Sequence, residues 1–168
     1  IGAMKVKSGD EVIYATIDNP DKKMALFTQN GNGAIVAKDI PVTNRMGVGV
    51  KRLALDKQDK IIGVSQVSNA DAFAIFTSNG YAKILKYSEV GESARNRKGQ
   101  ALLGSKHKEH SLIRVEKLST DYNYVMQNED EKLTYLYSKN IPLDVRLGNG
   151  KQMLKTNKLL NVYKFIIV

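Results

Sequence analysis

The chain repeats itself along its length. Met24-Ala-Leu-Phe-Thr-Gln-Asn-Gly31 recurs as Phe73-Ala-Ile-Phe-Thr-Ser-Asn-Gly80, so that Phe27 and Phe76 lie 49 residues apart. The flanking positions follow the same spacing: Met4, Val6, Asp10, Val12 and Ile13 fall on Leu53, Leu55, Asp59, Ile61 and Ile62. Self-similarity at a period of roughly 20–50 residues is typical of solenoids, propellers and other arrays. We therefore expect a series of equivalent units.

Each unit is predicted to be built of short β-strands. The apolar runs at 24–27 and 73–76 stop at polar turns that contain Asn30-Gly31 and Asn79-Gly80. Asn and Gly tolerate the positive φ of a tight hairpin, so these turns predict strand–turn–strand junctions. No long stretch shows the 3.6-residue apolar period of a helix. Several short strands in a repeat of about 45 residues indicate an all-β, propeller-type array of three to four four-stranded blades.

A third copy is predicted in the C-terminal part of the chain. Lys132 to Asn140 is similar to the hairpin segment, with Tyr137 in the place of Phe76 and an insertion expected within 119–131. Gly150 to Leu154 is similar to Gly99 to Leu102. The predicted units of this single domain are 1–18 (partial), 19–68, 69–118 and 119–168. Because the first unit is incomplete and no Met begins the chain, we expect a piece of a longer polypeptide.

The charge of the chain points to a polyanion as partner. Its 168 residues include 26 Lys and Arg against 17 Asp and Glu, for a formal charge of +9. A large basic excess favours nucleic acid or an anionic membrane, and no basic amphipathic helix supports the membrane. The absence of Cys excludes a disulfide scaffold and fits a cytoplasmic protein. No apolar run approaches the roughly 20 residues that span a bilayer.

The basic residues recur with the repeat, in its loops and at its strand ends. In a radial array such positions line one continuous rim, which can follow a phosphate backbone without reading bases. Ordinary surface solvation by Lys and Arg is the alternative interpretation. The candidate DNA-binding residues are Lys83, Lys86, Arg95, Arg97, Lys98 and Lys106 in one unit and Lys38, Arg45, Lys51 and Arg52 in the preceding one.

The pattern resembles the C-terminal domain of bacterial type IIA topoisomerase A subunits, those of DNA gyrase and topoisomerase IV. The resemblance rests on Asn79-Gly-Tyr-Ala-Lys83, on Tyr87-Ser-Glu-Val90 and on the basic loop that ends at Lys98-Gly99. Gly47 to Leu55, followed by Asp59-Lys-Ile-Ile-Gly-Val64, resembles the other half of the family repeat. The similarity covers essentially the whole chain and is strongest up to Leu118.

The resemblance implies a β-pinwheel, in which neighbouring blades exchange strands and a basic outer edge bends duplex DNA. It implies a non-catalytic domain of a bacterial, nucleoid-associated enzyme. The partners would be an ATPase B subunit, in an A2B2 assembly, together with the rest of the A subunit. ATP and Mg²⁺ would be used elsewhere in that enzyme, with no cofactor in this domain.

The family's wrapping loop is only partly present. In gyrase this loop has the form Gln-Arg-Arg-Gly-Gly-Lys-Gly, and the aligned stretch here is Ser93-Ala-Arg-Asn-Arg-Lys-Gly99. Arg95, Lys98 and Gly99 stay in register, while Asn96 and Arg97 replace the two central glycines. This departure favours the A protein of a topoisomerase IV, or a gyrase piece downstream of its own heptapeptide.

No catalytic or metal site is predicted. His107 and His110 lack the further ligands that a metal site needs, and we expect them to be solvated loop residues. Phe73, Phe76 and Tyr137 are expected in the core rather than as base-stacking platforms. The alternative function from a different class is a propeller-like protein–protein interaction module without a DNA role.

Overall fold

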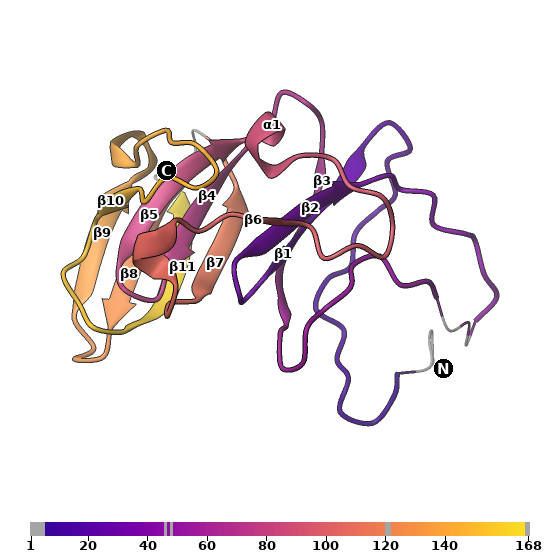
Figure 1. Cartoon of the computed structure of the whole chain (residues 1–168), viewed down its shortest axis with the longest axis horizontal. Coiled ribbons are helices and arrows are strands. Elements are labelled where there is room, and N and C mark those ends of the chain that lie inside the picture. The colour runs from indigo at the N-terminus through magenta and orange to yellow at the C-terminus, as the bar shows by residue number, and fades with distance from the viewer. Residues whose placement is uncertain (1–5, 46, 48, 120–121, 167–168) are drawn as a thin grey trace.

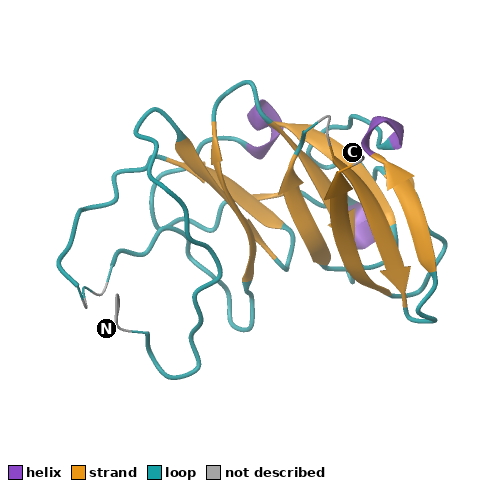
Figure 2. Ribbon diagram, turned by 180° about the vertical axis from the view of Figure 1, so that it is seen from behind, coloured by secondary structure: helices purple, strands orange, loops and turns teal. Residues whose placement is uncertain are grey.

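The computed structural model describes residues 6–45, 47, 49–119 and 122–166, and almost all of its regular structure is β-strand (Figures 1 and 2). Three sheets stand side by side along the molecule. The strands are β1 (Lys23–Thr28), β2 (Asn32–Val36), β3 (Ile61–Val67), β4 (Ala72–Thr77), β5 (Tyr81–Lys86), β6 (Gln100–Ala101), β7 (Leu112–Lys117), β8 (Tyr122–Asn128), β9 (Leu133–Tyr137), β10 (Lys151–Gln152) and β11 (Leu159–Ile166). The helical turns are α1 (Tyr87–Val90), η1 (Ser105–His107) and η2 (Ser138–Asn140).

Each sheet is centred on one hairpin, and later parts of the chain complete it. The strand orders are β3-β1-β2-β6, β10-β5-β4-β7 and β11-β8-β9. The short strand β6 follows the second hairpin yet pairs with the first, and β10 follows the third hairpin yet pairs with the second. This exchange of strands between neighbours confirms the predicted all-β pinwheel architecture.

A side chain at the end of the first hairpin strand closes each turn. The Thr28 hydroxyl accepts the backbone N–H of Asn32 at 3.2 Å, and the Thr77 hydroxyl accepts that of Tyr81 at 3.2 Å. Both turns carry a glycine in the left-handed region, Gly31 at φ 88° and Gly80 at φ 77°. The two Asn-Gly segments thus form equivalent hairpin turns, as predicted.

The third hairpin lies elsewhere than the sequence comparison suggested. The Asn128 side-chain oxygen accepts the N–H of Lys132 at 2.9 Å, and Glu131 takes the left-handed position at φ 61°. Asn128 is therefore the counterpart of Thr77, 51 residues later, and the proposed insertion within 119–131 is wrong because β8 occupies most of it. In the third hairpin Asn128 replaces the threonine and Glu131 replaces the glycine, so a comparison of residue identities did not detect this turn.

Most of the hydrophobic core lies in two layers between the sheets, and a smaller cluster on the first sheet is formed by Leu26, Ala34, Val36 and Leu53. Phe27 meets Phe73 with ring centroids 4.9 Å apart between the first two sheets, and Phe76 meets Tyr124 at 4.8 Å between the second and third. Phe73 and Phe76 are fully buried, as predicted. Tyr137 is 47% exposed, so its assignment to the core is wrong; it lies in β9, opposite Asn123.

The arrangement defines an inner and an outer edge. The strands β3, β7 and β11 contact one another in succession and form the inner edge. The opposite edge is formed by β2, β5 and β9 with the loops that follow them. Residues 6–21 form no strand, although their positions match β3 of the next unit.

Candidate nucleic-acid interface

The basic loop between α1 and β6 is held at the outer edge of the first sheet. The N–H of Asn96 donates to Arg52 O at 2.9 Å, and the N–H of Ala54 donates to Arg97 O at 3.0 Å. Asn96 has φ 61°, a left-handed conformation that Asn tolerates better than most residues. Asn96 can therefore adopt a backbone conformation that is otherwise typical of the glycine found here in the gyrase loop. A Cβ at Gly99 would lie 2.5 Å from Gly33 O, so this position requires glycine.

The loop presents its charges to solvent. Arg95, Arg97 and Lys98 are all exposed. Arg95 lies 3.9 Å from the Asp39 carboxylate, and the Lys98 ammonium lies 2.5 Å from that of Asp56. Exposed ion pairs of this kind contribute little to stability, about 0–1 kcal/mol, so a phosphate can displace the carboxylates at small cost.

Lys83 is buried, and its prediction as a DNA contact is wrong. Its residue exposure is 3%, and its ammonium sits among backbone carbonyl oxygens. The distances from Nζ are 2.8 Å to Leu102 O, 2.7 Å to Arg146 O, 2.8 Å to Gly148 O and 3.3 Å to Val145 O. Burial lowers the pKa of Lys83 to about 8, while the carboxylates of Asp144 and Glu89 act in the opposite direction.

Lys83 thereby holds the loop from Asp144 to Gly150 through its carbonyl groups. This loop belongs to the next unit, where it is the counterpart of the basic loop. The Asp144 carboxylate accepts the N–H of Gly150 at 2.7 Å, and that of Glu89 accepts the N–H of Arg146 at 2.7 Å. The Arg146 guanidinium donates to the Gln100 side chain. Most polar groups of this loop are thus engaged within the protein.

Two further predicted residues are also turned inward. The Lys38 side chain is 6% exposed, and its ammonium pairs with Asp18 and donates to Asn19 O and to Gln66. The Arg52 side chain is largely buried and pairs with Asp39. The Arg52 hydrogen bond lowers the pKa of the Asp39 carboxyl group. Lys38 is unsuited to bind DNA directly, and Arg52 supports the basic loop through its backbone and through Asp39.

The remaining predicted residues are exposed. Lys86 ends β5, Lys106 lies in η1, and Arg45 and Lys51 lie in the loop before β3. The Lys106 ammonium lies 5.0 Å from the centre of the Tyr81 ring, a cation–π contact. These four side chains leave their charges accessible to a polyanion.

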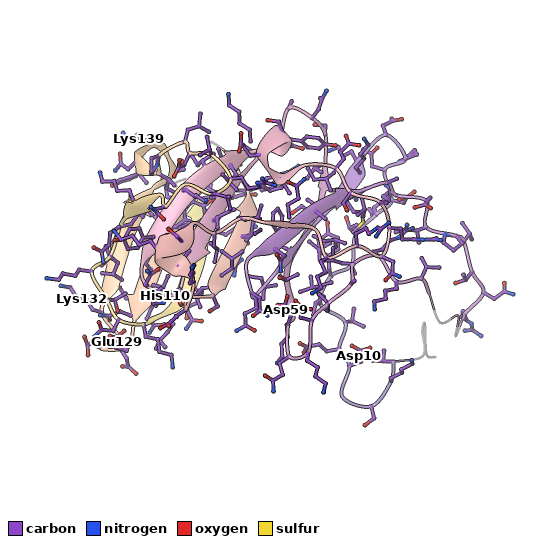
Figure 3. The ribbon with its side chains drawn as sticks, in the orientation of Figure 1. Asp10, Asp59, His110, Glu129, Lys132 and Lys139 are labelled. Atoms are coloured by element: carbon purple, nitrogen blue, oxygen red, sulfur yellow. The ribbon has the colours of Figure 1, made fainter. Side chains whose placement is uncertain are left out.

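His107 is a buried residue that the sequence comparison misjudged. It is 2% exposed, its Nε2–H donates to Asn149 O at 2.9 Å, and its Nδ1 accepts from the Asn79 amide at 3.2 Å. Because the carbonyl can only accept, this geometry requires the neutral ring with its proton on Nε2. Burial lowers the pKa of His107, the hydrogen bond to Asn149 O acts in the opposite direction, and the positive charges of Lys83 and Lys106 lower the pKa further. His110, labelled in Figure 3, lies near the second hairpin turn, because its Nδ1 is 3.4 Å from the hydroxyl of Ser78, the residue before Asn79.

No helix in the described ranges is long and apolar enough to cross a membrane.

Comparison with known proteins gives a consistent result. The family model described as "DNA gyrase C-terminal domain, beta-propeller" matches residues 22–68 and 71–115, which is more than half of the chain. The A subunit of DNA topoisomerase 4 from Bacillus subtilis is 23% identical over 150 residues, which cover 88% of this chain and 19% of that protein. The chain thus spans about a fifth of the length of this relative.

Solved structures agree with the fold. The C-terminal domain of a DNA topoisomerase IV superposes with a TM-score of 0.86 at 19% identity, covering 98% of this chain and 53% of that one. The C-terminal domain of a DNA gyrase A superposes with a TM-score of 0.79 at 26% identity, covering 98% and 57%.

Proposed function

This chain belongs to the DNA gyrase C-terminal, beta-propeller family, and on that premise we propose that it binds and bends duplex DNA through phosphate contacts at the outer edge of its sheets. Its role is DNA presentation rather than catalysis. The observation that supports the proposal best is the loop Ser93–Gly99, because three exposed cationic side chains stand there on a backbone fixed by hydrogen bonds to 52–54. A fixed loop loses little conformational freedom on binding.

The structure refines the set of residues that we propose to contact DNA. Lys83 and Lys38 leave the set because their ammonium groups are buried, and Arg52 acts through Asp39. Phosphate contacts carry no base information, so the binding is expected to show little sequence preference. The proposed contacts are Arg95, Arg97, Lys98, Lys86, Arg45, Lys51 and Lys106.

The wider setting is also a proposal. We infer that the chain belongs to a topoisomerase A protein that works with an ATPase partner, in a bacterial cytoplasm and in contact with the nucleoid. ATP and Mg²⁺ would act in other parts of that assembly. Exposed Arg97, where gyrase has a glycine, adds a charge to the loop and keeps DNA further from its backbone. This favours a bending role over the tighter wrapping by gyrase.

The test is a charge-removal experiment with a matched control. Arg95, Arg97 and Lys98 are replaced together by Ala, and binding to a duplex of mixed sequence is measured by fluorescence anisotropy across a salt series. Losing three phosphate contacts should make the slope of log K against log salt shallower by roughly 2.7. The control triple Lys132, Lys155 and Lys158 removes the same charge from exposed positions near the third hairpin turn (Lys132 is labelled in Figure 3).

An equal loss from both triples would show that charge acts diffusely and would overturn the proposed loop contact. Binding that does not change with salt in the unmodified chain would overturn the DNA role and favour the protein-interaction alternative.

A further inference from the structure

The loop at the outer edge of the second sheet carries large apolar side chains that its counterpart on the first sheet lacks. The register of the two loops follows from their backbone pairing. The N–H of Ser93 donates to Ile35 O on β2 at 2.8 Å, and the N–H of Asp144 donates to Ile84 O on β5 at 3.0 Å. Ser93 and Asp144 are therefore equivalent. In this register the second loop has Leu143, Val145 and Leu147 where the first has Glu92, Ala94 and Asn96.

These three side chains are open to solvent, although sheets lie on both sides of the one that carries them. The exposed fractions are 59% for Leu143, 60% for Val145 and 54% for Leu147. The first and third sheets flank the second sheet in Figure 1, and neither covers these side chains. Single exposed apolar residues are common on protein surfaces, whereas a series at every second position of one loop indicates a contact surface.

The backbone of this loop is fixed from within the protein. The Lys83 ammonium contacts three of its carbonyl oxygens. The Asp144 carboxylate accepts the N–H of Val145 at 2.8 Å, and the Glu89 carboxylate accepts that of Arg146 at 2.7 Å. A loop held in this way presents its apolar side chains in one arrangement and loses little conformational freedom on binding.

The surroundings of the loop suit a polyanion. Exposed ammonium groups lie on the elements around it: Lys139 in η2 before the loop (labelled in Figure 3), Lys151 in β10 after it and Lys86 at the end of β5. The carboxylates of Asp144 and Glu89 are half-buried and accept backbone N–H groups of the loop. The apolar side chains thus stand among positive charges, which suits a nucleic-acid duplex better than an uncharged protein surface.

Duplex DNA that follows the outer edge from the basic loop reaches this loop next, because the two loops occupy equivalent places on neighbouring sheets. Apolar side chains can press between two base pairs in the minor groove, partly unstack them and kink the duplex. We propose that Leu143, Val145 and Leu147 form such a wedge, which opens a base step and sharpens the bend. The inference rests on the proposed function and adds to it a contact with bases rather than with phosphates.

A wedge has a different energetic signature from a phosphate contact. On an intact duplex the cost of unstacking offsets the apolar contact, so the wedge changes the bend more than the affinity. A mismatched base pair is easier to unstack, and a wedge therefore favours it. Phosphate contacts carry no such preference, because the backbone of a mismatched duplex has the same charge.

The experiment compares two duplexes of equal length that differ by one central mismatch, with affinity measured by fluorescence anisotropy. The unmodified 168-residue chain should bind the mismatched duplex at least about threefold more tightly. Replacing Leu143, Val145 and Leu147 together by Ser should bring this ratio to about one, with the affinity for the matched duplex within about twofold of the unmodified value. The control triple Val12, Ile13 and Ile17, also replaced by Ser, removes exposed apolar side chains ahead of β1 and should keep the ratio.

The bend is measured by energy transfer between dyes at the two duplex ends, which should be higher with the unmodified chain than with the Leu143, Val145 and Leu147 variant. The Arg95, Arg97 and Lys98 variant should lose affinity but keep the mismatch preference.

Two kinds of failure are distinguishable. A chain that binds DNA without preferring the mismatch, or a preference that survives in the Leu143, Val145 and Leu147 variant, would overturn the wedge alone and assign the apolar loop to a protein partner. A chain that binds neither duplex would overturn the proposed function as well. Single replacements of the three residues by Ser keep the test decisive if the triple variant fails to fold.

Discussion

Replacing Lys83 by Met separates the structural from the DNA-binding role of the basic residues that follow the hairpin turn. Met has a similar length and flexibility but cannot donate a hydrogen bond. The substitution therefore leaves the carbonyl groups of Leu102, Arg146 and Gly148, now within 2.9 Å of the ammonium, without that donor.

The magnitude follows from these three contacts. A buried carbonyl that loses its partner costs about 1 kcal/mol or more, so the free energy of unfolding should fall by roughly 3 kcal/mol. For a domain of this length each kcal/mol corresponds to about 2–4 °C in Tm, which gives a decrease of roughly 6–12 °C. The matched control is Lys86→Met, the same change three residues later on the same strand but at an exposed position, where about 0.5 kcal/mol is expected.

Thermal unfolding followed by circular dichroism measures the change in stability of each variant. DNA affinity is measured separately, at a temperature well below the Tm of both variants. Lys83→Met should bind DNA as the unmodified chain does, whereas Lys86→Met should bind more weakly because its charge lies at the outer edge. Equal stability of the two variants would refute the carbonyl site. A larger loss of DNA affinity in folded Lys83→Met than in Lys86→Met would refute the inward placement of Lys83.

Three other predictions concern DNA affinity, pH and the third turn. If the domain contacts on the order of six phosphates, log K should fall with log salt at a slope of about −5; a flat dependence would contradict phosphate binding. The folded state requires neutral His107, and the pKa of His107 is lowered there. Its contribution to the free energy of unfolding is therefore complete above about pH 6.5, the pKa of histidine in the unfolded chain. This contribution is lost as the pH falls through the lower pKa of His107 in the folded state. Unfolding free energies at pH 6.5 and 5.5 should differ in the unmodified chain and in His110→Gln but not in His107→Gln, and a difference that persists in His107→Gln would assign the titration elsewhere. Glu131→Gly should stabilise the chain by about 0.5–1 kcal/mol in urea unfolding, because φ 61° disfavours Glu but suits Gly; a decrease would mean that the Glu131 side chain holds the turn.

The first two units were predictable because their turn chemistry is local. Both turns use a threonine hydroxyl that accepts the N–H four residues later and a glycine between them with positive φ. The pairs are Thr28 with Gly31 and Thr77 with Gly80, so each turn is specified by residues close in sequence. The third unit uses Asn128 and Glu131 for the same backbone geometry, so matching by residue identity moved the alignment ten residues downstream onto β9. A comparison of hydrogen-bonding capacity, in which Thr and Asn are equivalent acceptors, would have placed it correctly.

The burial of Lys83 and Lys38 could not be predicted from the residues next to them in the sequence. The carbonyl partners of Lys83 come from residues 19 to 65 positions later, and Asp18 and Gln66 reach Lys38 from other parts of the fold. One signal was available, because Lys83 is the counterpart of Ala34, a small residue that is fully buried. His107 offered no such signal, since its burial depends on Asn149 from the next unit.

The outer edge is therefore regular in backbone but not in charge. The loops Ser93–Gly99 and Asp144–Gly150 occupy equivalent places, each before the short strand that completes a sheet. The first engages its backbone with 52–54 and leaves three cationic side chains exposed to solvent, two of them in surface ion pairs, whereas the second uses its carbonyls to hold Lys83 and its Arg146 to bind Gln100. Under the proposed function, the repeated fold sets where a polyanion approaches, and the residues of each loop decide whether it binds there. On this basis the first loop, rather than the whole rim, is expected to dominate the affinity for DNA.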